Sequence, residues 1–413
     1  MPTILHLDMD SYFASVEQQF NQSLVGKPVG VIKAEGRTCI IAASREAKKF
    51  GVKTGCNIWD AKTLCPKIAL VSAHFGRYFS VTKKFIKICE NFSPYIEIFS
   101  IDELFMDVTE SQKFFGGVLN MCNLIKKQIN KQIGEYITCT IGISYNRLLA
   151  KLASEINKPN GIFEINKQNR DETLFAAKLT DICGLGFRLE KRLGDMGIKN
   201  LETLRNIPIE FLSASFGPFW SVHLKNLSYG EDNTNLNFFS ELQDAKSISR
   251  TFTLFDDTCD ERKIKQTLRN LCEEVGYKLR KMKMETRQLG LLIRGNDLSE
   301  KIHHTFKTYT SDSDEIFKNI WELFNRLNWQ NSVRFLGVWV GLLEKTENLS
   351  LSIFPEQHRK DDYWQTIDNI NDRWGGFTIY PASLLGGELI RPEVNGFLGD
   401  KKYQLSQITN PRG

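Results

Sequence analysis

Two short acidic clusters constrain the fold most, because each lies at the end of an apolar, strand-like segment. In the first, Asp8-Met9-Asp10, the preceding Leu5 and Leu7 face one way and Asp8 the other. The second, Ser100-Ile101-Asp102-Glu103, lies in the middle of residues 95–108, between two short apolar runs. Alternation with a period of two is typical of half-buried strands. Asp8 is therefore expected to end a strand on its polar face, and 95–108 to form a hairpin with acidic residues at its turn.

The chain up to residue 165 alternates strands with helices. Further strands are expected at 28–32, 39–43, 137–143 and 162–165, and helices at 11–20, 45–51, 78–92, 114–132 and 147–156. Apart from a small insertion at about 26–77, this order is close to a split βαβ sheet with helices on one face.

A length of 413 residues implies more than one domain, because single cores stop growing at about 250 to 300 residues. Residues 166–230 are expected to form a helical module with short glycine-containing turns, followed by a polar linker at 231–244. A second α+β module should span 245–346, and the tail to Gly413 should be only partly structured. The hydrophobic content of 41% is that of a well-cored protein rather than a disordered one.

Charge and composition narrow the possible partners. The net charge of +5 permits a polyanionic partner without requiring one. No run of about 18 apolar residues and no basic-then-apolar leader occur, so a cytoplasmic protein without membrane contact is expected. The nine cysteines include no Cys-x-x-Cys pair, which indicates reduced thiols rather than a zinc site.

The acidic clusters suit magnesium chemistry. Mg²⁺ prefers oxygen ligands and is usually held by one or two carboxylates plus substrate phosphates. Asp8, Asp10, Asp102 and Glu103 are the candidates, and the last two can converge only at a turn or bulge. Two such cations would stabilise the attacking and leaving oxygens of a phosphoryl transfer. For either cluster alone, ordinary strand-end carboxylates remain the alternative.

Several cations and glycines could bind phosphate. Arg45 and Lys48 lie at i and i+3 on one expected short helix, and Lys158 lies in a tight turn, although each alone also fits a solvated charge. Gly184 and Gly186 precede a helix and would let backbone N–H groups approach a DNA phosphate, with a helix C-cap as the alternative. A basic cluster on an expected helical stretch could bind DNA or simply face solvent: Lys278, Arg280, Lys281, Lys283 and Arg287.

Taken in order, these residues resemble the Y-family (translesion) DNA polymerases, close to the branch of bacterial DNA polymerase IV and UmuC. The matching segments are Leu7-Asp8-Met9-Asp10-Ser11-Tyr12-Phe13-Ala14-Ser15-Val16-Glu17, Ala47-Lys48-Lys49-Phe50-Gly51-Val52, Ser100-Ile101-Asp102-Glu103, Gly142-Ile143-Ser144, Leu149-Ala150-Lys151-Leu152-Ala153-Ser154 and Lys158-Pro159-Asn160-Gly161. The resemblance covers about residues 1–346, and its acidic signatures are specific as an ordered set.

The resemblance implies an α+β, right-hand polymerase fold. A split βαβ palm would carry the metals, beside small fingers, a helix-hairpin-helix thumb and an α+β little finger. The implied boundaries are palm 1–25 and 78–165, fingers 26–77, thumb 166–230, linker 231–244, little finger 245–346 and C-terminal tail 347–413.

It also implies a set of site residues. Asp8, Asp102, Glu103 and the Met9 carbonyl would bind two Mg²⁺, whereas Asp10, which the strand pattern alone also nominates, is left out. Nucleotide contacts would come from Tyr12, Phe13, Arg45, Lys48 and Lys158, and DNA contacts from Gly184, Gly186, Lys278, Arg280, Lys281 and Lys283. Phe13 matches the steric gate that would collide with a ribose 2′-OH, and the alternative is a core position on an apolar stripe with Val16 and Phe20.

One departure from the family pattern concerns the triphosphate. Many relatives carry Tyr-x-x-Arg where this chain has Arg45-Glu46-Ala47-Lys48. Arg45 would replace a tyrosine hydroxyl with a charge, while Lys48 keeps the cation but loses the two-pronged geometry of a guanidinium. Binding should survive this change, but the affinity for nucleotide is in question.

A second motif lies just past the expected little finger. Leu349-Ser350-Leu351-Ser352-Ile353-Phe354 is similar to the sliding-clamp motif Gln-Leu-Ser-Leu-Phe without its glutamine, so Leu351, Ile353 and Phe354 would bind a clamp. A last strand of the preceding module is the alternative. Residues 367–375 resemble the end of some UmuC-like chains.

The function implied is template-directed DNA synthesis. A primer 3′-OH would attack the α-phosphate of a dNTP on a primer-template, by a monomeric, error-prone enzyme suited to damaged DNA. Two alternatives stay open: a non-catalytic DNA-binding relative, and a nucleotide cyclase with a palm-like metal site. Lesion preference, fidelity, damage induction and the role of the tail cannot be read from the sequence.

Overall fold

The structure is a computed structural model that describes residues 1–33, 37–232, 234–236, 244–350, 355–387 and 390. The chain divides into two compact units, formed mainly by residues 1–34 with 39–242 and by residues 243–413. Among the described residues, no helix combines the length and the apolar character needed to cross a bilayer.

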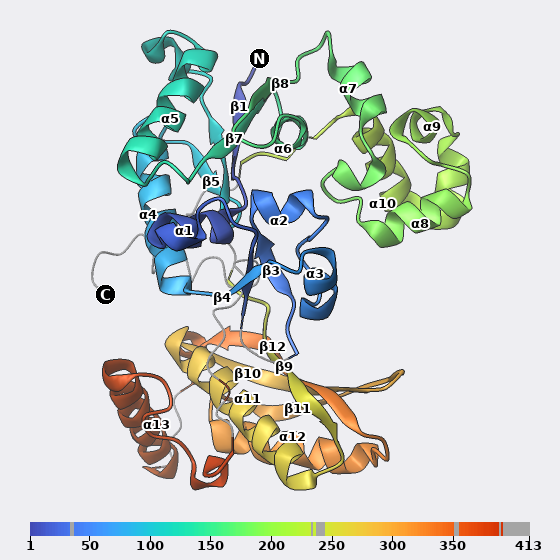
Figure 1. Cartoon of the computed structure of the whole chain (residues 1–413). Helices are drawn as coiled ribbons and strands as arrows, with labels where there is room; N and C mark the ends of the chain where they lie inside the picture. The colour runs from blue at the N-terminus through green and yellow to red at the C-terminus, as the bar shows by residue number, and fades with distance from the viewer. Residues whose placement is uncertain (34–36, 233, 237–243, 351–354, 388–389, 391–413) are drawn as a thin grey trace. The chain divides into compact units, whose positions relative to one another are not determined.

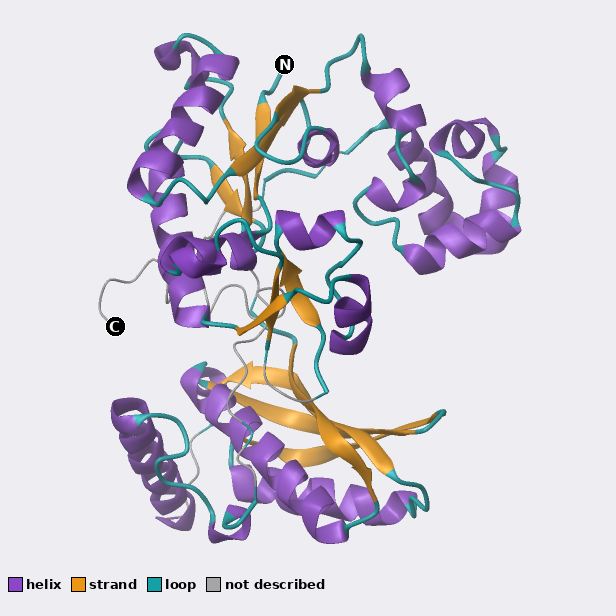
Figure 2. Cartoon of the chain, viewed as in Figure 1, coloured by secondary structure: helices purple, strands orange, loops and turns teal. Residues whose placement is uncertain are grey.

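A five-stranded sheet forms the centre of the first unit (Figures 1 and 2). Its strands, in the spatial order β5-β6-β1-β7-β8, are Ile96–Ile98, Glu103–Asp107, Ile4–Met9, Cys139–Ser144 and Ile162–Glu164. β1 is antiparallel to both neighbours, and β8 runs parallel to β7. The predicted first strand and the 95–108 hairpin are confirmed, because β5 and β6 pair antiparallel on either side of the acidic turn.

Helices cover both faces of this sheet, so the prediction of helices on one face is wrong (Figure 1). α4 (Phe75–Glu90) and α5 (Val118–Gln132) cover the apolar face, where Cys89 and Cys122 lie near Cys139 of β7. α6 (Arg147–Ile156) covers the opposite face, where Ser154 forms a 2.7 Å hydrogen bond with His6 of β1. The face that the sequence pattern marks as polar is therefore buried under a helix.

The insertion after α1 (Tyr12–Phe20) forms a smaller layer with its own core. Its sheet has the order β3-β2-β4, from Ile40–Ala43, Val29–Ile32 and Ala69–Ser72, beside α2 (Arg45–Lys49) and α3 (Ile58–Leu64). Ser44 begins α2 as predicted: its side chain accepts a hydrogen bond from the Ala47 N–H.

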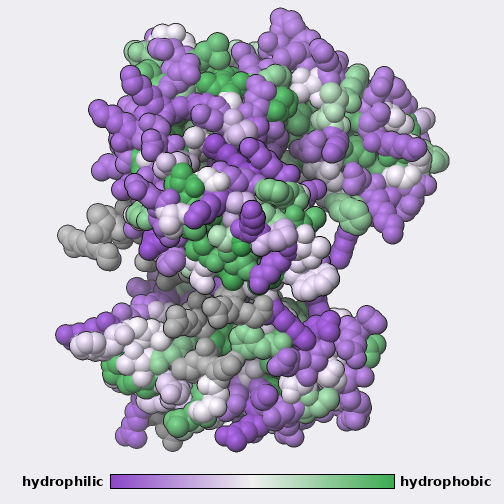
Figure 3. All heavy atoms as spheres, in the orientation of Figure 1, coloured by the Kyte–Doolittle hydropathy of each residue, from purple (hydrophilic) through white to green (hydrophobic). Residues whose placement is uncertain are grey.

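The segment after β8 is helical and belongs to the first compact unit. It contains α7 (Arg170–Ala176), α8 (Phe187–Asp195), α9 (Leu201–Asn206) and α10 (Ile209–Tyr229), the last kinked at Gly217, whose φ is 79°. Its surface mixes hydrophilic with hydrophobic side chains (Figure 3). The exposed hydrophobic side chains include Phe187 and Phe219.

The second unit is the predicted α+β module. An antiparallel sheet in the order β11-β10-β12-β9 packs against α11 and α12. In chain order its elements are β9 (Ser247–Thr258), α11 (Glu261–Lys281), β10 (Met284–Gly295), β11 (Leu298–Thr310), α12 (Ser313–Leu327) and β12 (Val333–Lys345), followed by α13 (Pro355–Trp374). Short 3₁₀ turns complete the described part: Gln22–Leu24, Gln112–Phe115, Leu179–Asp181, Thr346–Asn348 and Ala382–Leu384.

Candidate active site

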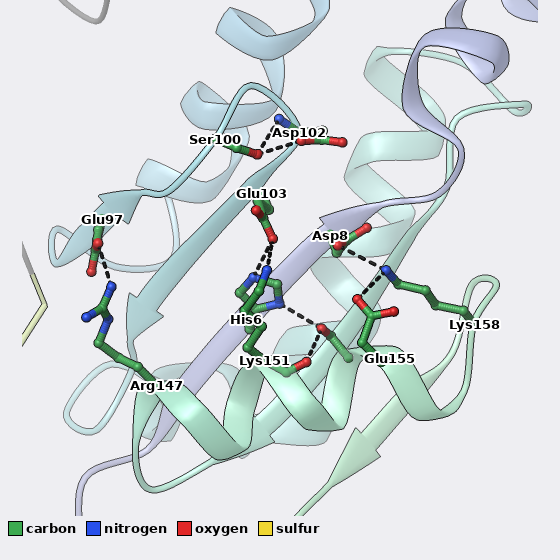
Figure 4. Close-up of polar contacts among 11 residues, drawn as sticks. His6, Asp8, Glu97, Ser100, Asp102, Glu103, Arg147, Lys151, Glu155 and Lys158 are labelled. Carbon is green, nitrogen blue, oxygen red and sulfur yellow. Dashed lines mark hydrogen bonds and ion pairs between the residues drawn. The ribbon is translucent and has the colours of Figure 1, made fainter. Parts of the chain in front are cut away.

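The two acidic clusters meet at one edge of the central sheet (Figure 4). Antiparallel pairing of β1 with β6 places Asp8 directly opposite Glu103, and the Met9 N–H donates to the Asp102 carbonyl at 2.9 Å. Residues that are 95 positions apart in the chain thereby face one another.

Asp8 and Asp102 are half-buried carboxylates whose negative charges are only partly balanced by neighbouring groups. Burial raises the pKa of Asp8 to about 7, even though the Lys158 ammonium lies 3.0 Å away and favours the charged form. Burial also raises the pKa of Asp102, against the hydrogen bond that it accepts from the Ser100 hydroxyl. Added positive charge would stabilise both, so this oxygen donor set fits a hard divalent cation.

Glu103 is held away from Asp102. Its Oε2 accepts a 3.1 Å hydrogen bond from His6 Nε2 and forms an ion pair with Lys151, and Figure 4 shows it pointing toward these two side chains. Burial would raise the pKa of Glu103, but His6 and Lys151 outweigh it and lower the pKa to about 2. As the side chains stand, no three acidic, histidine or cysteine groups among the described residues form a ready metal cluster.

His6 and Lys151 were missed at the sequence level. Burial lowers the pKa of His6 to about 4, so at neutral pH the ring is uncharged and can donate to Glu103 through Nε2. The available signal was the position of His6, two residues before Asp8 and therefore on the same face of β1.

Asp10 has a different role from the other three carboxylates. It is almost fully buried and accepts hydrogen bonds from the hydroxyls of Thr138 (2.6 Å) and Thr140 (2.8 Å) and from the Asn160 N–H (2.8 Å). Arg45 Nη2 lies 3.4 Å from the same carboxylate. These donors occupy both oxygens, which agrees with leaving Asp10 out of the metal set.

Two of the three expected phosphate-binding cations lie near Asp8. Lys158 bridges Asp8 and Glu155, at 3.0 and 2.7 Å. Lys48 of α2 is exposed. Desolvation of its ammonium and the neighbouring Lys158 lower its pKa, while Asp8 raises it. Arg45 instead turns to Asp10 and to the hydroxyl of Thr138.

Phe13, the expected steric gate, is half-buried among aromatic side chains. Its ring stacks on Tyr78 with the centroids 4.3 Å apart, and its side chain stays partly exposed. The expected apolar stripe does not extend to Phe20, because Val16 is buried whereas Phe20 is 57% exposed. Tyr12 is buried and its hydroxyl donates to the Tyr78 carbonyl at 2.8 Å.

The expected DNA-binding residues fall into two groups. Gly186 is the N-cap of α8, and a Cβ there would meet nothing within 4 Å, whereas Gly184 has a φ of +95° that favours glycine. The basic cluster is not one helical stretch: Lys278, Arg280 and Lys281 end α11, Lys283 lies in the following turn and Arg287 on β10.

Part of this cluster is already paired with α13. The Arg280 guanidinium forms two hydrogen bonds with Asp368, at 2.7 and 2.9 Å, and Lys281 pairs with Asp372. Lys278 is buried. The expected clamp residues Leu351, Ile353 and Phe354 lie outside the described residues.

Comparisons with known proteins show the family of this chain. Two models of the impB/mucB/samB family match the chain, one at residues 7–155 and the model of the C-terminal domain at 245–353. DNA polymerase IV of Pelotomaculum thermopropionicum is 32% identical over 388 residues, which cover 92% of this chain and 95% of that protein. DNA polymerase IV of Dehalococcoides mccartyi is 31% identical over 376 residues, which cover 90% and 95%.

The fold matches as well. A solved Y-family DNA polymerase chimera of Dbh and Dpo4 superposes with a TM-score of 0.71 and 26% identity, covering 83% of this chain and 99% of that one. The expected α+β right-hand polymerase fold is thus confirmed, and neither the cyclase nor the non-catalytic alternative is favoured. The chain belongs to the Y family of DNA polymerases and is similar to DNA polymerase IV.

Proposed function

We propose that this chain performs the DNA-directed DNA synthesis of its family with two Mg²⁺ ions held by Asp8, Asp102, Glu103 and the Met9 carbonyl. The observation that carries the proposal is the meeting of the two acidic clusters, where Asp8 of β1 lies opposite Glu103 of β6 and the Met9 N–H donates to the Asp102 carbonyl. Partial burial also raises the pKa values of Asp8 and Asp102. When bound, divalent ions lower the pKa of the primer 3′-OH and neutralise charge on the triphosphate.

The chain's own residues prepare this site. Lys158, now paired with Asp8, would move its ammonium to the triphosphate once Asp8 has a metal partner. Lys48, whose charge also interacts with that of Asp8, would join it. His6 and Lys151 hold Glu103 until it turns to its ligand position. Phe13, stacked on Tyr78, closes the side on which a 2′-OH would lie.

The remaining functions would be distributed over four domains. We assign the palm to residues 1–25 and 78–165, the fingers to 26–77, the thumb to 166–230 and the little finger to 245–346, joined by the linker 231–244. Backbone N–H groups at Gly184 and Gly186 would contact a DNA phosphate. A monomer acting on a primer-template, with translesion synthesis as its cellular use, completes the proposal.

Primer extension with Mg²⁺ on damaged and undamaged templates tests it. Asp102→Ala should reduce the rate by about 100-fold or more, because a transition-state charge loses its support. Asp107→Ala is the matched control: this carboxylate is also on β6, but it accepts hydrogen bonds from Thr109, away from the site. DNA binding should persist in both variants. Full primer extension by Asp102→Ala would show that the Asp102 carboxylate is not needed for catalysis, which contradicts the proposal.

A further inference from the structure

One buried carboxylate connects the two segments that carry Lys48 and Lys158. Asp10, at the end of β1, accepts a hydrogen bond from the backbone N–H of Asn160 at 2.8 Å, in the turn that begins with Lys158. The same carboxylate faces Arg45, the first residue of α2, and Lys48 follows one helical turn later. Its side chain is only 3% exposed, so water contributes little to balancing its charge.

Arg45 completes this arrangement from the outside. Its guanidinium reaches from α2 to Asp10 Oδ2 at 3.4 Å and to the hydroxyl of Thr138. That hydroxyl donates to Asp10 at 2.6 Å, while Thr140 donates to the other oxygen at 2.8 Å. Arg45 is the one charged group of α2 that contacts Asp10 among the described residues.

The geometry has a consequence for the phosphate-binding cations. Residues at i and i+3 of a helix share a face, so fixing Arg45 against the sheet also fixes the face that presents Lys48. The bond to the Asn160 N–H fixes the turn that presents Lys158. Both lysines are thereby held on the Asp8 side of the sheet edge, where each interacts with the charge of Asp8.

We propose that Asp10 and Arg45 form a positioning bridge that holds Lys48 and Lys158 for the incoming triphosphate, and that Arg45 acts through Asp10 rather than on a phosphate. This inference rests on the proposed polymerase function, because it concerns the substrate contacts of that site. This role would explain why Arg45 stands where many relatives carry a tyrosine. Arg45 holds α2 against the sheet, and the two lysines bind the phosphates.

A double-mutant cycle distinguishes two roles for Arg45, positioning through Asp10 and direct binding of a phosphate. We would measure kcat and KM for dNTP in Mg²⁺-dependent primer extension for the wild type, Arg45→Gln, Asp10→Asn and the double variant. Each single change should raise KM about fivefold to tenfold and alter kcat less than twofold, because a loosened site loses preorganisation for the bound substrate. The double variant should be no worse than the poorer single variant, because both changes break one bridge.

A direct phosphate contact predicts a different result. The KM increase of Arg45→Gln would then multiply with that of Asp10→Asn, and this outcome would overturn the bridge. Arg45→Lys should recover part of the KM, since an ammonium can still pair with Asp10. Arg326→Gln, a change at an exposed arginine on α12, is the control for the substitution itself.

Amide hydrogen exchange gives a readout that does not depend on catalysis. Arg45→Gln should fold, because the Arg45 side chain is 36% exposed, and it should speed exchange at the Asn160 amide relative to the wild type. Unchanged exchange at Asn160 would also overturn the bridge. A wild-type protein that fails to extend primers with Mg²⁺ would instead contradict the proposed function, so the two failures are distinguishable.

Discussion

Replacing Phe13 should change how strongly the enzyme prefers deoxyribonucleotides over ribonucleotides. Its ring lies against Tyr78 and stays partly exposed, so removing it opens space beside the site without emptying a core. Phe13→Ala should improve the use of ribonucleotides relative to deoxyribonucleotides by about 10- to 100-fold, the size expected when an overpacked contact is relieved. The measurement is the ratio of kcat/KM for rNTP and dNTP in primer extension.

Phe20 offers a matched control on the same helix. It is 57% exposed and the guanidinium of Arg77 lies over its ring, so Phe20→Ala should leave sugar selectivity unchanged. Equal selectivity in Phe13→Ala and the wild type would remove Phe13 from the gate.

The stability of the folded chain should depend on pH through the Asp8 carboxyl. Its pKa is about 7 in the folded state and about 3.9 in an unfolded chain, so the folded state holds the extra proton between these values. Stability from this group is therefore present at low pH and is lost as pH rises through 7. In metal-free buffer, Asp8→Asn should raise Tm by more at pH 8 than at pH 5. A gain that does not change with pH would show that burial does not hold the Asp8 pKa up.

The sequence located the acidic residues but not their orientation. Strand alternation placed Asp8 on the polar face, and the hairpin pattern put Asp102 and Glu103 at its turn. Glu103 points toward His6 of β1 and Lys151 of α6, and Lys151 lies 48 residues further along the chain. Local periodicity contains no information on such distant partners. The contact between Arg45 and Asp10 escaped prediction for the same reason.

At the scale of elements, the contact of α6 with β7 depends on Gly142. A Cβ there would lie 2.0 Å from the Ala150 carbonyl and 2.4 Å from the Ser154 nitrogen, both on α6. Gly142→Ala should therefore push α6 off the sheet, lower the free energy of unfolding by about 2 to 4 kcal/mol and slow primer extension, since α6 carries Lys151. Thermal unfolding and the extension rate measure the two effects.

Gly194 on α8 provides the opposite case. A Cβ there meets nothing within 4 Å and its φ is not positive, so Gly194→Ala should stabilise the chain by up to about 1 kcal/mol. If Gly142→Ala and Gly194→Ala lower Tm by the same amount, Gly142 is not required for the close approach of α6 to the sheet.

Element prediction succeeded where one segment determines its own structure. The bounds expected for α6 were matched, and Ser44 caps α2 as expected, because an apolar stripe and a capping residue are local signals. The layer arrangement was missed because the polar residues on β1 suggested a face open to water. His6 on that face is fully buried, and its partners on α6 and β6 satisfy both ring nitrogens.

At the scale of the whole molecule, the C-terminal helix complicates any test of the clamp motif. Four side chains of α13, at intervals of four residues, contact the helices of the second unit: Lys360, Trp364, Asp368 and Asp372. A helix that repeats its contacts every fourth residue docks along one face. Truncation before the motif would therefore remove a packed part of the second unit together with the motif.

Point changes separate the two effects. Leu351→Ala with Phe354→Ala should abolish the stimulation of primer extension by a bacterial sliding clamp, a loss of about 10- to 100-fold, because tethering acts through effective concentration. Asp368→Asn with Asp372→Asn should instead weaken the docking of α13 and lower Tm, since Arg280 and Lys281 lose their partners, while the clamp still stimulates. The measured quantity is the ratio of extension rates with and without clamp on primed DNA. A ratio that survives the alanine pair but falls in the asparagine pair would place the clamp contact on α13 rather than on residues 351–354.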